Sequence, residues 1–377
     1  MNPNFPAQSQ KSLTIKVPGK LYIAGEYAVL APNQPAILLA LDQYLELKIT
    51  KRTGEHSLVE NHQADYPTLG LAVKEEALTQ ANQPPLTSKE LSKWRYVIQA
   101  IKVAKSFLQE CGIDFQAFHL QIQSHLMNKA GLKYGLGSSG AVTVGTLKAL
   151  LAFHDLKITP EKLYRLAVIS QLQLGTAGSF GDLAANSFGG WIYYQAPERN
   201  ALQAMMTESS SITNLLNCEW PSLVIERLEV PTELQLLIGW TQQPASTDNL
   251  VNQLLDQVKV RPQPYQAFLD QAQSAVLQLK EGLIENHPQS IDQAINAYRD
   301  SLEYLSGAYD LSIETNSLTK LITIANNHHY AAKSSGAGGG DCGIALGFDL
   351  QYKAAIVSQW QTQQIIPLDL GPAPQIS

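Results

Sequence analysis

The sequence predicts an α+β protein of two domains. Its 377 residues exceed the length that a single hydrophobic core usually serves. Segments with the alternation of strands and segments with the spacing of helices both occur, without the regular βαβ succession of a parallel sheet. We expect the domains to span residues 1–225 and 226–377, with the boundary near the stretch from Pro221 to Pro231.

Strands are expected where apolar and polar residues alternate or where a short run is apolar throughout. The segments concerned are 13–17 (LTIKV), 44–50 (YLELKIT), 120–124 (LQIQS) and 235–240 (QLLIGW). Pro18-Gly19 predicts a turn directly after the first of them. Residues 331–347 are expected to form a glycine-rich turn that runs into a further strand, GIALGF.

Helices are expected where apolar residues recur every three or four positions. This spacing predicts helices over 89–111 and 287–305, and another that begins just after Gly140. Thr159 and Pro160 have the residue types of an N-cap and a first helical position, which predicts a helix from there to about Gln173.

The composition excludes several classes of protein. A net charge of -6 provides no overall positive field for nucleic acid, and no apolar run approaches the ~18 residues of a membrane helix. The first residues lack the basic and apolar regions of a signal peptide. Three widely spaced cysteines suit reduced thiols and form neither a disulfide framework nor a zinc motif. We therefore expect a cytoplasmic protein, monomeric or homodimeric, without nucleic-acid or membrane partners.

The first loop that could bind a ligand or take part in catalysis is GLGSSG, from Gly135 to Gly140. It fits the G-x-G-x-x-G pattern of dinucleotide sites, but that pattern needs a strand directly before it and an acidic residue ending a second strand about 20 positions on. Here the nearest predicted strand ends at Ser124, and Asp155 lies in a helix–helix connection. A Walker loop is excluded because no lysine precedes the serines.

Small residues that open a helix let backbone N–H groups approach a phosphate, and the helix N-terminus adds positive potential. The hydroxyls of Ser138 and Ser139 suit a phosphate or Mg²⁺, while the alternative is a tightly packed helix N-cap. No acidic residue lies between Asp114 and Asp155, and three lysines do: Lys129, Lys133 and Lys148. This local positive charge favours an anion site, unless it is a chance feature of an apolar segment.

Two further loops suit anions. Residues 333–342 (KSSGAGGGDC) hold four glycines in five positions, so successive N–H groups can converge on an anion. The following strand argues against a merely flexible loop. Lys20 follows the turn predicted at Pro18-Gly19 and is placed to reach a phosphate, although by itself an exposed turn lysine is equally consistent.

In this order the three loops resemble the three motifs of the GHMP kinase superfamily. Within it the chain looks most like bacterial phosphomevalonate kinases. The residues that carry this likeness are Tyr27 in GEYAV where mevalonate kinases have His, Lys133-Tyr134 before the nucleotide loop, GSFGDLA at 178–184, and GWT at 239–241 with PAST at 244–247. Gln242 departs from the pattern, since a glycine commonly follows GWT.

The resemblance implies a two-domain GHMP kinase fold with the active site between the domains. It also implies transfer of the γ-phosphoryl group of ATP to (R)-5-phosphomevalonate, which gives a diphosphate and ADP in the mevalonate route to isoprenoids. The implied residues are Gly135, Leu136, Gly137, Ser138, Ser139 and Gly140 for ATP, Ser139 for Mg²⁺, Lys20, Lys133 and Asp182 for catalysis, and Lys20, Tyr27, Ser179, Ser246, Thr247, Gly336, Ala337 and Gly338 for the acceptor.

The acceptor decides what Asp182 does. In relatives that phosphorylate an alcohol, the corresponding Asp is a base, but a phosphate monoester with a second pKa of ~6 is already ionised at neutral pH. Our hypothesis is that Asp182 orients Lys20. The alternatives are mevalonate kinase or another kinase acting on an alcohol, a non-catalytic GHMP-like sensor, and a nicotinamide oxidoreductase; intact Lys20, Ser139 and Asp182 argue against the sensor.

Overall fold

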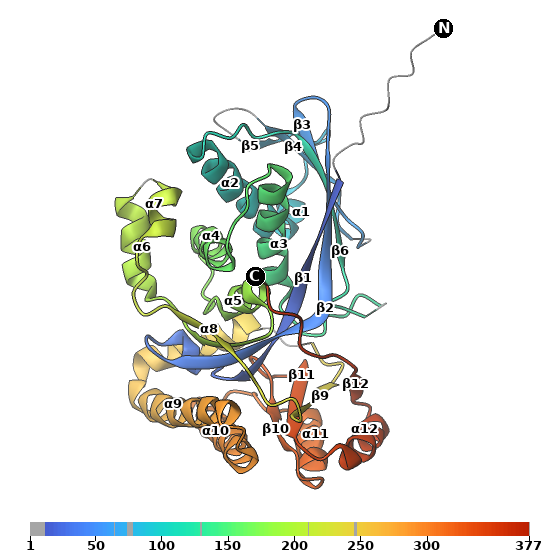
Figure 1. The fold of residues 1–377 in the computed structure, drawn as a ribbon, viewed down its shortest axis with the longest axis vertical. Helices are drawn as coiled ribbons and strands as arrows, with labels where there is room; N and C mark the ends of the chain where they lie inside the picture. The colour runs from blue at the N-terminus through green and yellow to red at the C-terminus, as the bar shows by residue number, and fades with distance from the viewer. Residues whose placement is uncertain are drawn as a thin grey trace.

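The computed structural model describes residues 12–63, 65–73, 78–128, 130–209, 211–244 and 247–376. They form two sheets, each with its own helices (Figure 1). The eight-stranded sheet has the order β5-β4-β3-β6-β2-β7-β8, with β1 paired to β2, and the four-stranded sheet has the order β10-β11-β9-β12. The α+β prediction is confirmed.

The strands of the larger sheet are β1 (Ser12–Ala24), β2 (Pro35–Lys51), β3 (His56–Asn61), β4 (Leu69–Val73), β5 (Leu78–Gln80), β6 (Phe118–Ser124), β7 (Trp191–Gln195) and β8 (Val224–Leu228). Those of the smaller sheet are β9 (Gln235–Trp240), β10 (Ala331–Ser334), β11 (Cys342–Gly347) and β12 (Ile366–Leu368). The four strands expected from alternation and apolar runs are therefore present.

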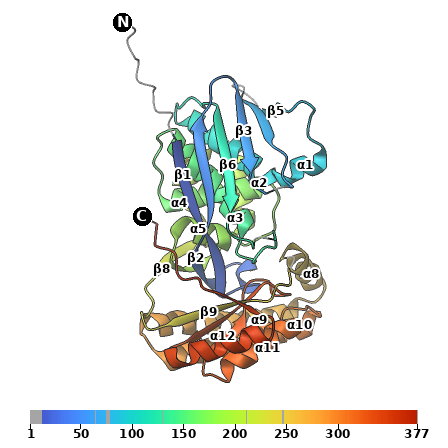
Figure 2. The same cartoon turned by 90° about the vertical axis from the view of Figure 1, so that its right-hand side faces the viewer.

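The helices α1 to α7 accompany the larger sheet and α8 to α12 the smaller one (Figure 1 and Figure 2). They are α1 (Ser88–Lys93), α2 (Arg95–Glu110), α3 (Ser138–Phe153), α4 (Pro160–Gln173), α5 (Gly181–Phe188), α6 (Arg199–Glu208), α7 (Ile212–Asn217), α8 (Thr247–Val260), α9 (Pro262–Ile284), α10 (Pro288–Tyr309), α11 (Asn316–Asn326) and α12 (Lys353–Thr362), with short 3-10 turns at Ala28–Leu30 and Leu350–Tyr352. Within the described ranges, none of the helices is both long and apolar enough to cross a membrane.

Several boundaries differ from the predictions. The helix expected over 89–111 is interrupted at Trp94, and α3 begins at Ser138, before Gly140. The turn predicted at Pro18-Gly19 is wrong, because β1 continues through it to Ala24 with a shift of register between these two residues. A bulge accommodates a proline that has no N–H for the ladder. Lys20 consequently lies within a strand. The strand β10 was not expected, since its four residues are too few for a pattern.

The chain passes from the larger to the smaller sheet between Leu228 and Gln235. We propose that the two domains divide there, a few residues beyond the predicted boundary at 225/226. The last residues return to the first domain. The Ala373 N–H donates to the Ala40 carbonyl (2.8 Å), and the Ile376 N–H donates to the Phe188 carbonyl (2.7 Å).

Candidate active site

A cavity of about 590 Å³ lies where the two sheets approach each other. Segments far apart in the sequence line it: β1, the GLGSSG loop, the segment before α5 and the glycine-rich turn after β10. The predicted residues that it brings together are Lys20, Tyr27, Lys133, Gly135, Gly137, Ser138, Ser139, Ser179, Asp182, Gly336 and Ala337.

The remaining predicted residues lie elsewhere. Leu136 is buried in the core. Gly140 and Gly338 are buried behind the surface of the cavity. Ser246 lies outside the described residues, and Thr247 is the first residue of α8.

The GLGSSG loop has the backbone of an anion site. Gly135 (φ +81°) and Gly137 (φ +78°) adopt left-handed conformations that favour glycine. Gly137 is the N-cap of α3 and supplies no side-chain acceptor, and the first turn contains no acidic residue. The first N–H groups of α3 are therefore left for a ligand, with the positive end of the helix dipole behind them.

The glycines of this loop also make room for charged side chains. A Cβ atom at Gly137 would lie 2.9 Å from Lys20 Cε, and one at Gly135 would lie 2.6 Å from the Asp341 carboxylate. A Cβ atom at Gly140 would overlap Asp182 Oδ2. The glycine pattern thus serves the packing of three neighbouring segments as well as the approach of a phosphate.

Lys20 is held against this loop by its main chain and its side chain. Its N–H donates to the Leu136 carbonyl (2.9 Å), and Nζ donates to the Gly135 carbonyl (3.3 Å). The ammonium group also lies 5.6 Å from the centre of the Tyr22 ring. Neither the Gly135 carbonyl nor the Tyr22 ring neutralises this positive charge, so Lys20 is suited to an anionic ligand in the cavity.

Asp182 lies in the first turn of α5, partly buried, and borders the cavity. Burial raises the pKa of the Asp182 carboxyl, while the charge of Lys20 and the N–H groups of Leu183 and Asp182 itself act to lower it. A partly buried carboxylate next to a cation in a cavity is typical of functional sites. Lys133, in contrast, is exposed where it borders the cavity.

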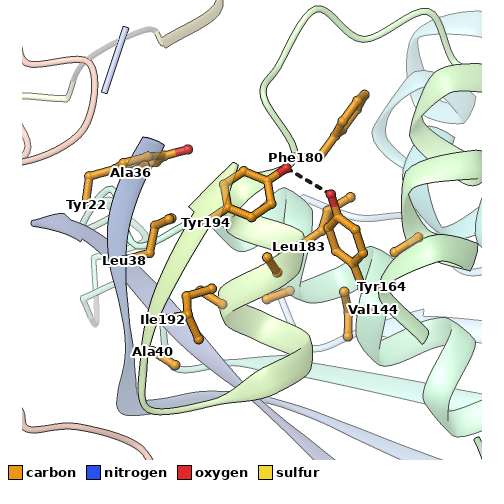
Figure 3. Packing of buried hydrophobic residues seen from close by; sticks show 14 of the residues in the cluster. Tyr22, Ala36, Leu38, Ala40, Val144, Tyr164, Phe180, Leu183, Ile192 and Tyr194 are labelled. Atoms are coloured by element: carbon orange, nitrogen blue, oxygen red, sulfur yellow. Dashed lines mark hydrogen bonds between the residues drawn. The ribbon is translucent and has the colours of Figure 1, made fainter. Parts of the chain in front are cut away.

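Ser179 is fixed from two directions by tyrosines that the sequence analysis did not identify. The Tyr22 hydroxyl lies 2.8 Å from Ser179 Oγ, and the Tyr194 hydroxyl donates to the Ser179 carbonyl (2.7 Å). Tyr194 in turn is hydrogen-bonded to Tyr164 (2.9 Å), as the dashed line in Figure 3 shows. Tyr22 lies two residues after Lys20 and therefore on the same side of β1. This spacing could have predicted from the sequence that Tyr22 borders the site.

Hydrogen bonds connect the glycine-rich turn to the end of β1 and to the segment that follows it. The Tyr27 hydroxyl donates to the Ala337 carbonyl, and Ser335 Oγ donates to the Tyr22 carbonyl (2.8 Å). A buried ion pair joins Glu26 with Lys333. Both residues lie inside sequence motifs, GEYAV and KSSGAGGGDC, but neither was predicted as a site residue. Burial lowers the pKa of Lys333, and the charge of Glu26 opposes this shift.

This arrangement agrees with comparisons to known proteins. Two family models match, the GHMP kinases N terminal domain over residues 95–190 and the GHMP kinases C terminal domain over residues 279–365. The chain is 35% identical to the phosphomevalonate kinase of Streptomyces sp. (strain CL190), over 97% of this chain and 98% of that protein. It is 24% identical to the mevalonate kinase of Thermococcus sibiricus, over 90% of each.

The fold resembles that of Streptococcus pneumoniae phosphomevalonate kinase, solved in complex with phosphomevalonate and AMPPNP. The TM-score is 0.82 at 29% identity, with 96% of this chain and 99% of that chain covered. The resemblance predicted from the three loops is confirmed by the two family models and by the full-length relative. The chain therefore belongs to the GHMP kinases.

Proposed function

We propose that the protein transfers the γ-phosphoryl group of ATP to the phosphate of (R)-5-phosphomevalonate, which gives the 5-diphosphate and ADP. The observation that carries this proposal is the convergence of Lys20, the GLGSSG loop and the Ser179 segment on one cavity. Relatives named as phosphomevalonate kinases, one of them solved with phosphomevalonate and an ATP analogue, support the same reaction.

ATP binds, in this proposal, with its phosphates at the N-terminus of α3. A second cavity of about 220 Å³ adjoins the first and shares Lys133, Ser138 and Ser139 with it. Tyr66, Trp94 and other apolar or aromatic residues line this second cavity, which suits the flat face of a nucleobase. The nucleoside would therefore occupy the smaller cavity and direct its phosphates into the larger one.

The main obstacle to the reaction is repulsion between two polyanions. Lys20 and Lys133 bring positive charge to the cavity, and Mg²⁺ would supply more when bound to the ATP phosphates. The hard oxygen donors that Mg²⁺ prefers are present in Ser139, Asp182 and Asp341. The described residues contain no group of three acidic, His or Cys side chains that could hold a metal by themselves. We accordingly infer that phosphate oxygens complete the coordination.

Asp182 acts on Lys20 in this proposal, and not as a base. The acceptor phosphate is mostly a dianion at neutral pH, since its second pKa is ~6, so removal of a proton contributes little. The electrostatic coupling between the Asp182 carboxylate and the Lys20 ammonium group supports a positioning role. Phosphoryl transfer depends on alignment and charge stabilisation, which such positioning provides.

The acceptor lies against Ser179 and the turn at Gly336 and Ala337. The Tyr27 hydroxyl already donates to Ala337, so Tyr27 can hold this turn and still offer its oxygen as an acceptor. Gly338 has no side chain to offer the acceptor and contributes the shape of the turn. A Cβ atom at this position would collide with the main chain of Ile313, so the turn packs closely only with glycine there. Contacts from Ser246 and Thr247 stay predictions.

The test is a coupled assay of ADP release with Mg-ATP, run in parallel on 5-phosphomevalonate and on mevalonate. Turnover of phosphomevalonate alone is the expected result. Turnover of mevalonate alone would overturn the assignment of the acceptor and make Asp182 a base. No turnover of either would favour another acceptor or a binding protein with a kinase fold.

A further inference from the structure

Tyr22 contacts three parts of the candidate site although the proposed reaction assigns it no role. Its ring lies 5.6 Å from Lys20 Nζ, and its hydroxyl lies 2.8 Å from Ser179 Oγ. Its carbonyl accepts a hydrogen bond from Ser335 Oγ of the second domain (2.8 Å). The side chain is 9% exposed and borders the cavity. It therefore lies between the predicted phosphate ligands Lys20 and Ser179.

The direction of the hydrogen bond between Tyr22 and Ser179 follows from burial. Among the described residues, Ser179 Oγ is the hydrogen-bond partner of the Tyr22 hydroxyl. A buried hydroxyl hydrogen without an acceptor is unfavourable, so Tyr22 is the donor. Burial also raises the pKa of Tyr22 far above its ordinary value, which keeps the proton in place at any pH at which the enzyme works.

This direction determines what Ser179 can do. A serine hydroxyl has one hydrogen to donate and two lone pairs. The Gly181 N–H donates to Ser179 Oγ (3.4 Å), and the Tyr22 hydroxyl occupies the other lone pair. The Ser179 carbonyl is held by Tyr194 (2.7 Å), which fixes the main chain as well. The hydrogen of Ser179 is thus left for a ligand in the cavity.

We propose that Tyr22 is a positioning residue that makes Ser179 a dedicated hydrogen-bond donor to the phosphate of the acceptor. A phosphate dianion presents only acceptor oxygens, so it is complementary to a serine that can only donate. An alcohol brings a hydrogen of its own and gains less from such a partner. Tyr22 would consequently help the site select a phosphate acceptor over an alcohol. This inference rests on the proposed function.

The test is Tyr22→Phe, which removes one oxygen atom and keeps the ring under Lys20. We expect the KM for 5-phosphomevalonate to rise ~10-fold, as for the loss of one aligned hydrogen bond, with kcat and the KM for ATP little changed. The matched control is Tyr164→Phe. It removes a hydroxyl from the same cluster (Figure 3) without contact to the Ser179 side chain, so both KM values should stay at the wild-type level.

Two further variants separate positioning from a loss of stability. Ser179→Ala should raise the acceptor KM by itself, and Tyr22→Phe in that background should add nothing, because Tyr22 acts through Ser179. Gly181→Ala keeps the Tyr22 hydroxyl but places a Cβ atom 2.5 Å from it, and should also raise the acceptor KM.

An unchanged acceptor KM in Tyr22→Phe would overturn the inference, as would an effect that persists in the Ser179→Ala background. If the wild-type enzyme does not turn over phosphomevalonate, the proposed function fails and the inference fails with it. If the wild type is active and Tyr22→Phe behaves like Tyr164→Phe, only the inference fails.

Discussion

Glu26 and Lys333, which lie 307 positions apart in the chain, form an ion pair with side chains that are 3% and 0% exposed. Glu26 belongs to the segment after β1, and Lys333 to β10 of the second domain. The pair is supported by the Lys333 bond to the Ser334 carbonyl and by the ring of Tyr298, 5.4 Å from Nζ. It joins the two domains at the wall of the cavity, which Glu26 lines.

Removal of one partner of this pair should destabilise the protein strongly. Lys333→Met leaves the Glu26 carboxylate buried without its cation, and we expect a loss of ~3–5 kcal/mol in the free energy of unfolding. The double variant Glu26→Gln/Lys333→Met removes both charges and should lose less than Lys333→Met. Urea unfolding measures both. The single variant Glu26→Gln completes the cycle, and a double variant as unstable as the sum of Lys333→Met and Glu26→Gln would show that the two side chains act independently.

Gly140→Ala should reduce activity although alanine favours a helix. The added methyl group overlaps Asp182 Oδ2 and lies 2.7 Å from Asn186 Oδ1, so the carboxylate must move. We expect kcat/KM to fall ~100-fold, because displacements near 1 Å have effects of this size. The control is Gly307→Ala on α10, where a Cβ atom meets nothing within 4 Å. It should leave activity unchanged and increase stability by ~0.5–1 kcal/mol. Full activity of Gly140→Ala would argue against a functional position for Asp182.

Asp182→Asn should increase stability at neutral pH. Burial raises the pKa of Asp182, so the folded state binds its proton more tightly than the unfolded state. Wild-type stability relative to the neutral variant therefore falls as the pH rises from the ordinary value of 3.8 through the raised pKa, and stays lower above it. Thermal unfolding should show a higher Tm for Asp182→Asn than for the wild type near pH 7, and a difference that shrinks as the pH falls toward the ordinary value of 3.8.

The same variant tests the role of Asp182 in the reaction. A positioning role predicts a loss of kcat of about 10–100-fold, whereas removal of an essential base predicts ~10⁴. The measurement is kcat with saturating ATP and phosphomevalonate. A loss near 10⁴ with Lys20 still in place would contradict the positioning role.

Lys20→Met should lose most of its activity and little stability. The ammonium group of Lys20 borders the cavity and carries charge toward the transferring phosphoryl group, so we expect kcat to fall by ~10²–10³. Lys16→Met is the control on the same strand. Lys16 pairs with Glu46 on the surface (2.9 Å), where water screens the pair, so its loss should leave both stability and kcat nearly unchanged. Equal kcat values in both variants would remove Lys20 from the mechanism.

The sequence by itself predicted those elements that have a clear local pattern, and the chemistry of the three loops. Alternation predicts β6, an apolar run predicts β9, helical spacing predicts α10, and Thr159-Pro160 predicts the start of α4, because these signals depend on neighbours along the chain. The glycines of the GLGSSG loop could be linked to an anion for the same reason. Their left-handed backbone is a local property that few other residues allow.

Only the tertiary structure decided which side chains meet. The pairs Tyr22–Ser179 and Glu26–Lys333 span 157 and 307 positions, and no local pattern connects their members. The continuation of β1 through Pro18-Gly19 likewise depends on its pairing with β2, which offers a bulge where the residues alone suggested a turn. Burial gives such contacts their strength, since a hydrogen bond or charge removed from water is costly to leave unpaired, and burial is a property of the assembled fold.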